Sequence, residues 1–104
     1  MIIVNTETIS GREISESLGM VRGSTVRARN VGRDIFAGLK NLIGGEISEY
    51  TQLLADSREQ ALERMISDAT RLNADAIVNV RLTTSAVMQG SSEILAYGTV
   101  VKLR

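Results

Sequence analysis

The chain has 104 residues, and its twelve basic and twelve acidic side chains cancel at neutral pH. This balance removes the overall attraction to polyanions, so we expect neither nucleic-acid nor membrane binding. Cysteine and histidine are absent, which excludes disulfides, thiolate or imidazole catalysis and zinc-thiolate sites. Hydrophobic residues make up 43% of the chain and aromatic residues only 3%, so we expect an aliphatic core.

The length predicts a single domain, residues 1–104, that as a monomer leaves roughly a third of its unfolded surface in contact with water. Residues 1–5 are too short and lack the basic leader of a signal peptide. No apolar run approaches the roughly 20 residues that cross a bilayer. We therefore expect a soluble, cytoplasmic domain that gains from association with copies of itself.

The first part of the chain favours β structure. Residues 2–4 are typical of a short strand, and residues 12–29 alternate as a longer strand interrupted by Gly19 and Gly23. Glycines inside a strand mark a bulge, a bend or the close approach of another backbone. We expect two strand pieces here rather than one straight ribbon.

Two helical patterns follow. Asn30 is a suitable cap for a short amphipathic helix that ends at Gly44 or Gly45. Ser48 is a suitable cap for a second helix reaching Leu72, a rod of roughly 37 Å, and Asn73 is placed to end it in the left-handed conformation. On its outer face the spacing predicts the ion pairs Arg64–Asp68 and Asp68–Arg71.

Two strands complete the chain, residues 76–85 and 93–103, joined by a hairpin loop at 88–92. The last strand is apolar on both faces, a pattern typical of a central strand that is covered twice. We expect it to lie antiparallel between the other two long strands, which then run parallel to each other. Because the helices of one domain cover only one side, another subunit is the simplest second cover.

Several motifs together resemble one family. They are G-x-V-x-G at 19–23, Asn30, D-I-F-A-G at 34–38, Gly44 and Gly45, Tyr50, A-L-E-R-M at 61–65 and N-A-D-A-I-V-N-V at 73–80. On these residues the chain resembles the uncharacterised YbjQ-like family, often labelled a heavy-metal-binding domain. The resemblance covers nearly the whole chain.

The resemblance implies an α+β fold of two layers, with an antiparallel or mixed sheet, one short helix and one long helix. It also implies a homopentameric ring whose subunit contacts include short exchanged strands, and it implies no established reaction. Soft heavy metals favour thiolate and imidazole ligands. This chain offers only carboxylate, carbonyl, amide and thioether ligands.

An anion site is the first candidate for ligand binding. The residues that suggest it are Arg22, Arg27, Arg29, Asn30 and Arg33, a locally basic stretch beside a predicted helix N-terminus. In a ring these groups recur around the axis. The same charges also fit salt bridges between subunits or a solvated surface, and the glycine motifs fit a bent strand and a helix end as well as a phosphate cradle.

Other candidates have equally plain structural interpretations. The pairs Glu46 with Glu49 and Glu59 with Glu63 fit an oxygen-ligand metal site, an acid/base couple or exposed helix charge. Met20, Met65 and Met88 are possible thioether ligands, but Met65 fits the core, and Met88 in the predicted loop is the one that we single out. The remaining candidates are Tyr50 and Tyr97, as acids or interface residues, and Asn79 and Arg81, as channel-lining or subunit-pairing groups.

These patterns predict a non-enzymatic homo-oligomeric binding or scaffold protein, with itself as partner and no cofactor. The alternative is a metal-ion or small-anion binding protein with sites at subunit boundaries or the ring axis. No catalytic residue and no metal ligand is assigned, and the small ligand is unknown. An enzyme would need chemistry from Ser, Tyr, Lys or carboxylates assembled between subunits.

Overall fold

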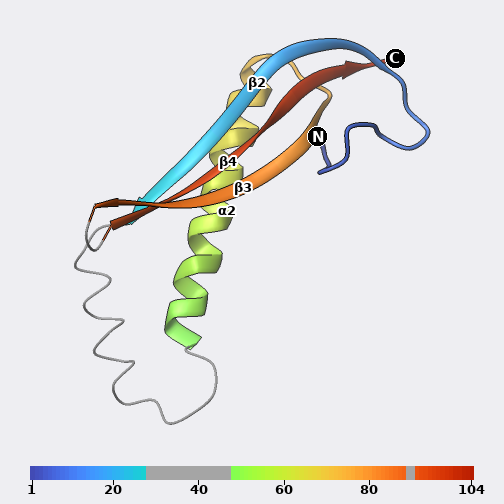
Figure 1. Ribbon diagram of the computed structural model, residues 1–104. Coiled ribbons are helices and arrows are strands. Elements are labelled where there is room, and N and C mark those ends of the chain that lie inside the picture. Colours follow the sequence, from blue (N-terminus) through green and yellow to red (C-terminus); the bar gives the residue numbers. More distant parts are fainter. Residues whose placement is uncertain (28–47, 89–90) are drawn as a thin grey trace.

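The fold combines one long helix with a four-stranded sheet (Figure 1). The computed structural model describes residues 1–27, 48–88 and 91–104. In chain order, the described elements are β1 (Ile2–Ile3), β2 (Ile14–Arg27), α2 (Ser48–Arg71), β3 (Ala76–Met88) and β4 (Ser91–Leu103). The predicted α+β class is confirmed. The short helix predicted after Asn30 lies outside the described residues.

The sheet has the order β1-β3-β4-β2, so the last long strand is flanked by the other two. β4 runs antiparallel to β2 and to β3, and β1 runs parallel to β3. The predicted central position of β4 is therefore confirmed, as is the common direction of β2 and β3. The hairpin strands extend further than predicted, to Met88 and from Ser91.

β2 is one continuous strand of 14 residues, so the expected division into two pieces is wrong. Its pairing with β4 shifts register between Ile14 and Glu16 and again between Ser17 and Gly19. Gly19 has a φ of 110°, which a glycine adopts without steric cost. The bulges take up the extra residues while the pairing continues, so the strand bends without breaking.

Gly23 is the point at which the helix backbone meets the strand. A Cβ at this position would overlap the backbone N of Met65 and the backbone O of Ala61. The prediction that another backbone comes close to this glycine is confirmed. Because the two backbones nearly touch, the strand has no room for a side chain at this position.

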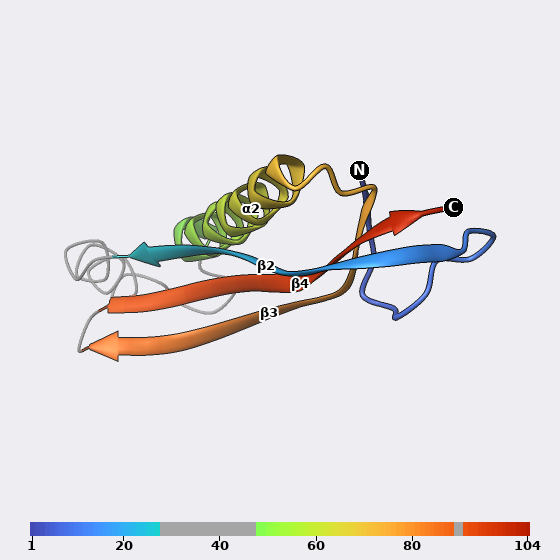
Figure 2. The ribbon, with the colours of Figure 1, turned by 90° about the horizontal axis from the view of Figure 1, so that it is seen from above.

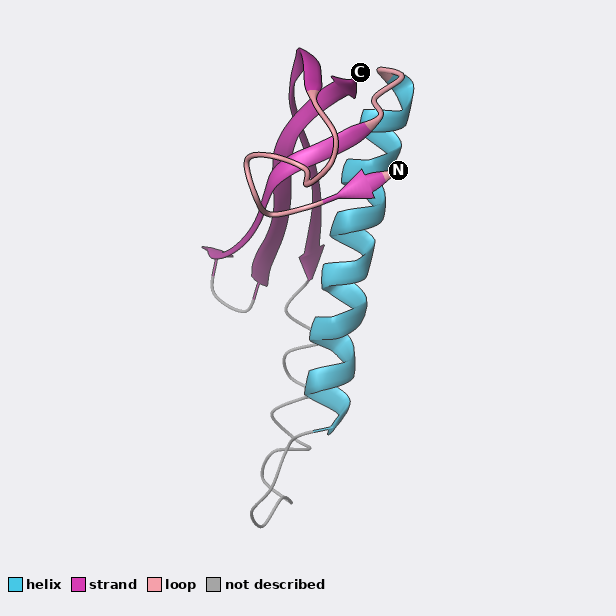
Figure 3. Ribbon diagram, turned by 90° about the vertical axis from the view of Figure 1, so that its right-hand side faces the viewer, coloured by secondary structure: helices cyan, strands magenta, loops and turns pink. Residues whose placement is uncertain are grey.

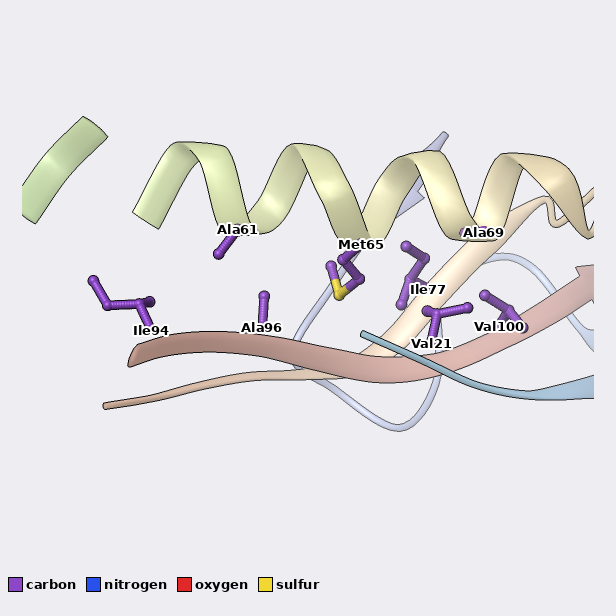
Figure 4. Packing of buried hydrophobic residues seen from close by; sticks show 8 residues of the cluster. All are labelled: Val21, Ala61, Met65, Ala69, Ile77, Ile94, Ala96 and Val100. Carbon is purple, nitrogen blue, oxygen red and sulfur yellow. The ribbon is translucent and has the colours of Figure 1, made fainter. Parts of the chain in front are cut away.

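The main core lies between α2 and the sheet (Figure 4). Its buried members are aliphatic: Val21, Ala61, Met65, Ala69, Ile77, Ile94, Ala96 and Val100. The helix packs on β2 and β4, and Figure 2 shows β3 as the long strand farthest from it. Figure 3 shows α2 running alongside the long strands. The helix therefore covers only part of one face.

A smaller core lies on the opposite face of the sheet, at one end. Ala76, Val78 and Val101 are buried there under residues of the N-terminal segment and of the strand ends, namely Ile2, Val4, Ile9, Ile14 and Leu103. The segment is held by backbone hydrogen bonds from Val4 N to Ile77 O (3.0 Å) and from Val80 N to Val4 O (3.0 Å). The second face is thus covered at one end by the chain itself.

The end of α2 follows the sequence prediction closely. The helix ends at Arg71, one residue before the predicted Leu72, and Asn73 has a φ of 58°. Asparagine tolerates this left-handed conformation better than most residues. The Asn73 N–H donates to Thr70 O and the Ala74 N–H donates to Ala69 O. These bonds satisfy carbonyls at the helix end and turn the chain into β3.

Candidate functional site: the uncovered part of the sheet

Alternation along β4 separates a covered face from an uncovered one. Ile94, Ala96, Gly98 and Val100 are buried on the side of α2, whereas Leu95, Tyr97 and Thr99, on the other side, are only partly buried. Register places side chains of the neighbouring strands beside them. We call this surface the open face: Met20, Arg22, Ser24, Val26, Arg81, Thr83, Ser85, Glu93, Leu95, Tyr97 and Thr99.

The open face leaves large apolar side chains exposed to solvent. Met20 is 69% exposed and Val26 is 57% exposed, and Leu95 and Tyr97 lie between them on β4. No element in the described part of the chain packs on this face beyond the N-terminal segment. Large apolar side chains exposed among polar groups on an uncovered sheet face are typical of an interaction site.

A row of cationic side chains crosses the open face. Arg22 and Arg81 are each paired in register with Tyr97, one from each side. Both arginines are exposed, and neither forms an ion pair within the residues that the structure describes. Arg81 Nη1 donates to Asn5 O at 2.7 Å, which fixes this guanidinium beside the N-terminal segment. The row offers donors to an anion or to a carboxylate of another subunit.

β3 has an outer edge that is only partly paired. β1 pairs with Ala76 and Ile77, and the N–H groups of Asn79 and Val80 donate to Thr6 O and Val4 O. Beyond these residues, none of the described segments pairs with the edge. Leu82–Ala86 are all exposed. We call Leu82–Met88 the free edge of β3.

The outer edge of β2 differs because the helix reaches over it. The Arg64 guanidinium donates to Ser24 O from α2. The predicted Arg64–Asp68 ion pair is therefore wrong, since a strand carbonyl competes for this arginine. Asp68 instead pairs with Arg71, as predicted from their spacing.

Asp75 links the start of β3 to the end of β4. Its carboxylate accepts hydrogen bonds from Leu103 N (2.8 Å) and Lys102 Nζ (3.2 Å), and the same ammonium group donates to Asn73 O (2.9 Å). The hydrogen bond from Leu103 N and then the one from Lys102 lower the pKa of Asp75 below its ordinary value. These partners make Asp75 a structural clamp.

Most of the predicted anion-binding residues are not tested by the structure. Arg29, Asn30 and Arg33 lie outside the described residues, and for Arg27 only the backbone is described, paired with Ser92 at the end of β2. Arg22 is the member of the predicted basic stretch whose surroundings are described, and it lies on the open face. The association of Arg22 with Arg81 depends on the register of three strands, which local spacing does not specify.

The predicted metal candidates do not come together in the described part of the chain. Glu59 and Glu63 are exposed on α2. No group of three or more acidic, Cys or His side chains that could hold a metal ion occurs among the described residues. The side chains of Glu49 and Met88 are not described, and Glu46 lies outside the described residues. Met65 is fully buried, which confirms its assignment to the core.

Two polar positions have roles that sequence reasoning did not resolve. Asn79 has a φ of 54° and lies where the pairing of β3 with β4 shifts register between Val78 and Arg81. The residue type at this position could have predicted the positive φ, because asparagine is among the residues that adopt it most readily. Tyr97 lies partly buried on the open face, and its role as an acid or an interface residue stays a prediction. The side chain of Tyr50 is not described.

These features define a class of protein: an α+β domain in which, among the residues that the structure describes, one long helix covers part of a mixed four-stranded sheet and leaves the other face largely open. None of the helices among the described residues is long and apolar enough to cross a membrane. The chain belongs to the YbjQ family, whose model matches residues 1–104 and is described as "Putative heavy-metal-binding".

Relatives and a solved structure agree with this assignment. The chain is 61% identical over 104 residues to a UPF0145 protein of Archaeoglobus fulgidus, covering 100% of this chain and 96% of that one. It is 59% identical to a UPF0145 protein of Halorubrum lacusprofundi, with 100% of both chains covered. A crystal structure of a protein of unknown function from Pediococcus pentosaceus, assigned to the DUF74 family, matches with a TM-score of 0.64. That match is 16% identical and covers 100% of this chain and 98% of the other, so it supports the fold alone.

Proposed function

We propose that this chain is the subunit of a homo-oligomeric binding or scaffold protein that carries out no reaction of its own. The observation that carries the proposal is the two-sided apolar character of β4. One side of this strand is buried under α2, and the other presents Leu95 and Tyr97 on the open face beside the exposed Met20 and Val26. A second copy covers this face most simply. The family resemblance favours a pentamer.

The dimensions of the subunit support the proposal. Its Cα radius of gyration is 17.0 Å, whereas a compact chain of this length has about 13 Å. A small elongated domain buries less of its surface than a compact one, so more apolar area is left for association. Covering a large apolar side chain contributes roughly 1.5–3 kcal/mol, and a stable interface covers about 800 Å² on each partner.

Sedimentation velocity or light scattering at micromolar concentration tests the proposal directly. We expect a species several times the 11.3 kDa of one chain, with five chains in each pentameric ring. A folded monomer at these concentrations would overturn the proposal. The measurement requires no knowledge of a ligand.

A charge on the open face should weaken the assembly without unfolding the subunit. Val26→Lys is suited to this test because Val26 is exposed and its cross-strand neighbour is Glu93, which favours a cation there. We expect a shift toward smaller species with unchanged secondary structure by circular dichroism. Ser67→Lys, on the exposed surface of α2, is the matched control and should keep the wild-type mass.

A second candidate function is the binding of a small anion where subunits meet. The row of Arg22, Tyr97 and Arg81 on the open face favours it, because two arginines are paired in register with the same tyrosine, one from each side. Calorimetric titration with inorganic phosphate should give binding that Arg22→Gln weakens several-fold. Divalent metal ions form the second arm, since the family description names heavy metals. Absence of heat and of a melting shift in both arms counts against this candidate.

A further inference from the structure

The free edge of β3 offers a line of backbone groups to another strand. The Val80 N–H points outward to Val4 O, and the direction of strand N–H groups alternates along the chain. The N–H and C=O groups of Leu82, Thr84 and Ala86 therefore face the same outer side. None of these three residues has an outward backbone partner within the described part of the chain.

This edge lacks the features by which sheets avoid pairing with other chains. Its sequence, L-T-T-S-A-V-M, contains no charged residue and no proline, and it is rich in residues that favour strands. Leu82 is 46% exposed. The outer edge of β2 is different, because Arg64 bonds to its Ser24 carbonyl and obstructs an incoming strand. The two edges of the subunit are thus unequal.

We propose that the free edge of β3 pairs antiparallel with the same edge of a second copy, about a two-fold axis at Thr84. This rests on the proposed self-association and identifies one of its contacts. The pairing sets Leu82 opposite Ala86 of the partner subunit and Thr83 opposite Ser85 of the partner subunit. Thr84 meets its own counterpart. An isologous contact of this kind needs a surface that complements itself.

The chemistry of the segment meets that requirement. No like charges face each other in this register, and threonine opposite threonine is a favourable cross-strand pair. Leu82 lies in register with Ala96, on the side of the sheet that α2 occupies. Because α2 packs on β2 and β4 and β3 lies farthest from it (Figure 2), this flank of β3 is free for the partner strand. The partner's Ala86 then covers part of the exposed Leu82 side chain.

A two-fold contact between the β3 edges of two copies fits better than a head-to-tail contact between β3 and β2. Pairing β3 with β2 of the next copy would meet the Arg64 guanidinium at Ser24. The two-fold contact joins two sheets of four strands into one of eight. It does not close a ring of five subunits, so in a pentamer it would join one ring to another.

Single-cysteine variants test the axis because the chain contains no cysteine of its own. Directly opposed residues of an antiparallel pair have Cα atoms about 4.5–5.5 Å apart, within the range that a disulfide spans. Under mild oxidation, Thr84→Cys should form a covalent dimer at least several-fold more than Ser67→Cys, the control on exposed α2. Equal cross-linking of the two variants would overturn the proposal.

A charge on the axis provides a second, independent measurement. Thr84→Lys places two ammonium groups face to face and should halve the mass of the assembly, whereas Thr84→Val should keep it. A wild-type monomer would overturn both the self-association and this contact. A wild-type oligomer whose mass is unchanged by Thr84→Lys, with no Thr84→Cys disulfide, would overturn this contact alone.

Discussion

Two glycines determine how closely the helix and the strands approach one another. Gly23 and Gly98 lie on neighbouring strands in the helix-facing part of the sheet, and an added methyl group would overlap other atoms at both. At Gly98 the nearest are a methyl of the Ile77 side chain at 2.7 Å and Val78 O at 3.0 Å. At Gly23 they are backbone atoms of α2, which have less freedom to shift. The helix therefore depends more strongly on Gly23.

Gly23→Ala should destabilise the subunit by about 1–3 kcal/mol, because the new Cβ pushes α2 away from the strand. The free energy of unfolding from urea titration measures the effect. Ser24→Ala is the matched control, since its side chain is only half-buried and the bond from Arg64 uses its backbone oxygen. It should change stability by less than about 0.5 kcal/mol. Equal effects at the two positions would contradict the close contact.

Asp75 should make stability depend on pH at the acid end. Its pKa is lower in the folded chain than its ordinary value, chiefly because of the bond from Leu103 N. The carboxylate therefore stabilises the fold above the ordinary carboxyl range of about 4, and this contribution is lost as the pH falls through the folded-state pKa. Asp75→Asn should lower stability at pH 7 and flatten the decline toward pH 2.

Unfolding at a series of pH values measures that slope. Glu63→Gln, which removes an exposed carboxylate from α2, is the control and should leave the pH profile close to that of the wild type. A profile for Asp75→Asn as steep as that of the wild type would contradict the role of the clamp.

Among the elements, α2 and β4 depend on each other for burial. Met65 is fully buried between them, whereas Met20 is 69% exposed on the other face. Met65→Ala should cost about 2–5 kcal/mol of the free energy of unfolding, from lost burial and the cavity left behind. Met20→Ala removes the same atoms from a surface position and should cost far less in a dissociated subunit. Chemical denaturation of dilute samples measures the loss of stability in each variant.

The sequence predicted these elements where their pattern was strong. The helical spacing of α2 and the two apolar faces of β4 were enough to place both, including the central position of β4. The bulge at Asn79 was missed because a register shift depends on the partner strands. The Arg64 bond to Ser24 was missed because residues 40 positions apart compete with a local ion pair. The open face was expected as a property of one strand, but its outline depends on how much of that side the N-terminal segment covers.

For the whole molecule, stability and association should be linked. Subunits that cover one another's open faces are stabilised by mass action, so the thermal midpoint should rise with protein concentration. Melting curves over a hundredfold range of concentration measure this dependence. The midpoint of Val26→Lys should vary less with concentration than that of the wild type. A wild-type midpoint that does not change with concentration would contradict the linkage.

The central position of β4 also affects how the protein is made. β2 and β3 do not pair with each other in this sheet, and both depend on a strand that is synthesised after them. While the ribosome is still adding residues 91–103, the nascent chain carries two long strands without their common neighbour. The sheet therefore cannot assemble stepwise from its N-terminal side. The interval before β4 emerges is when this chain is most exposed to aggregation.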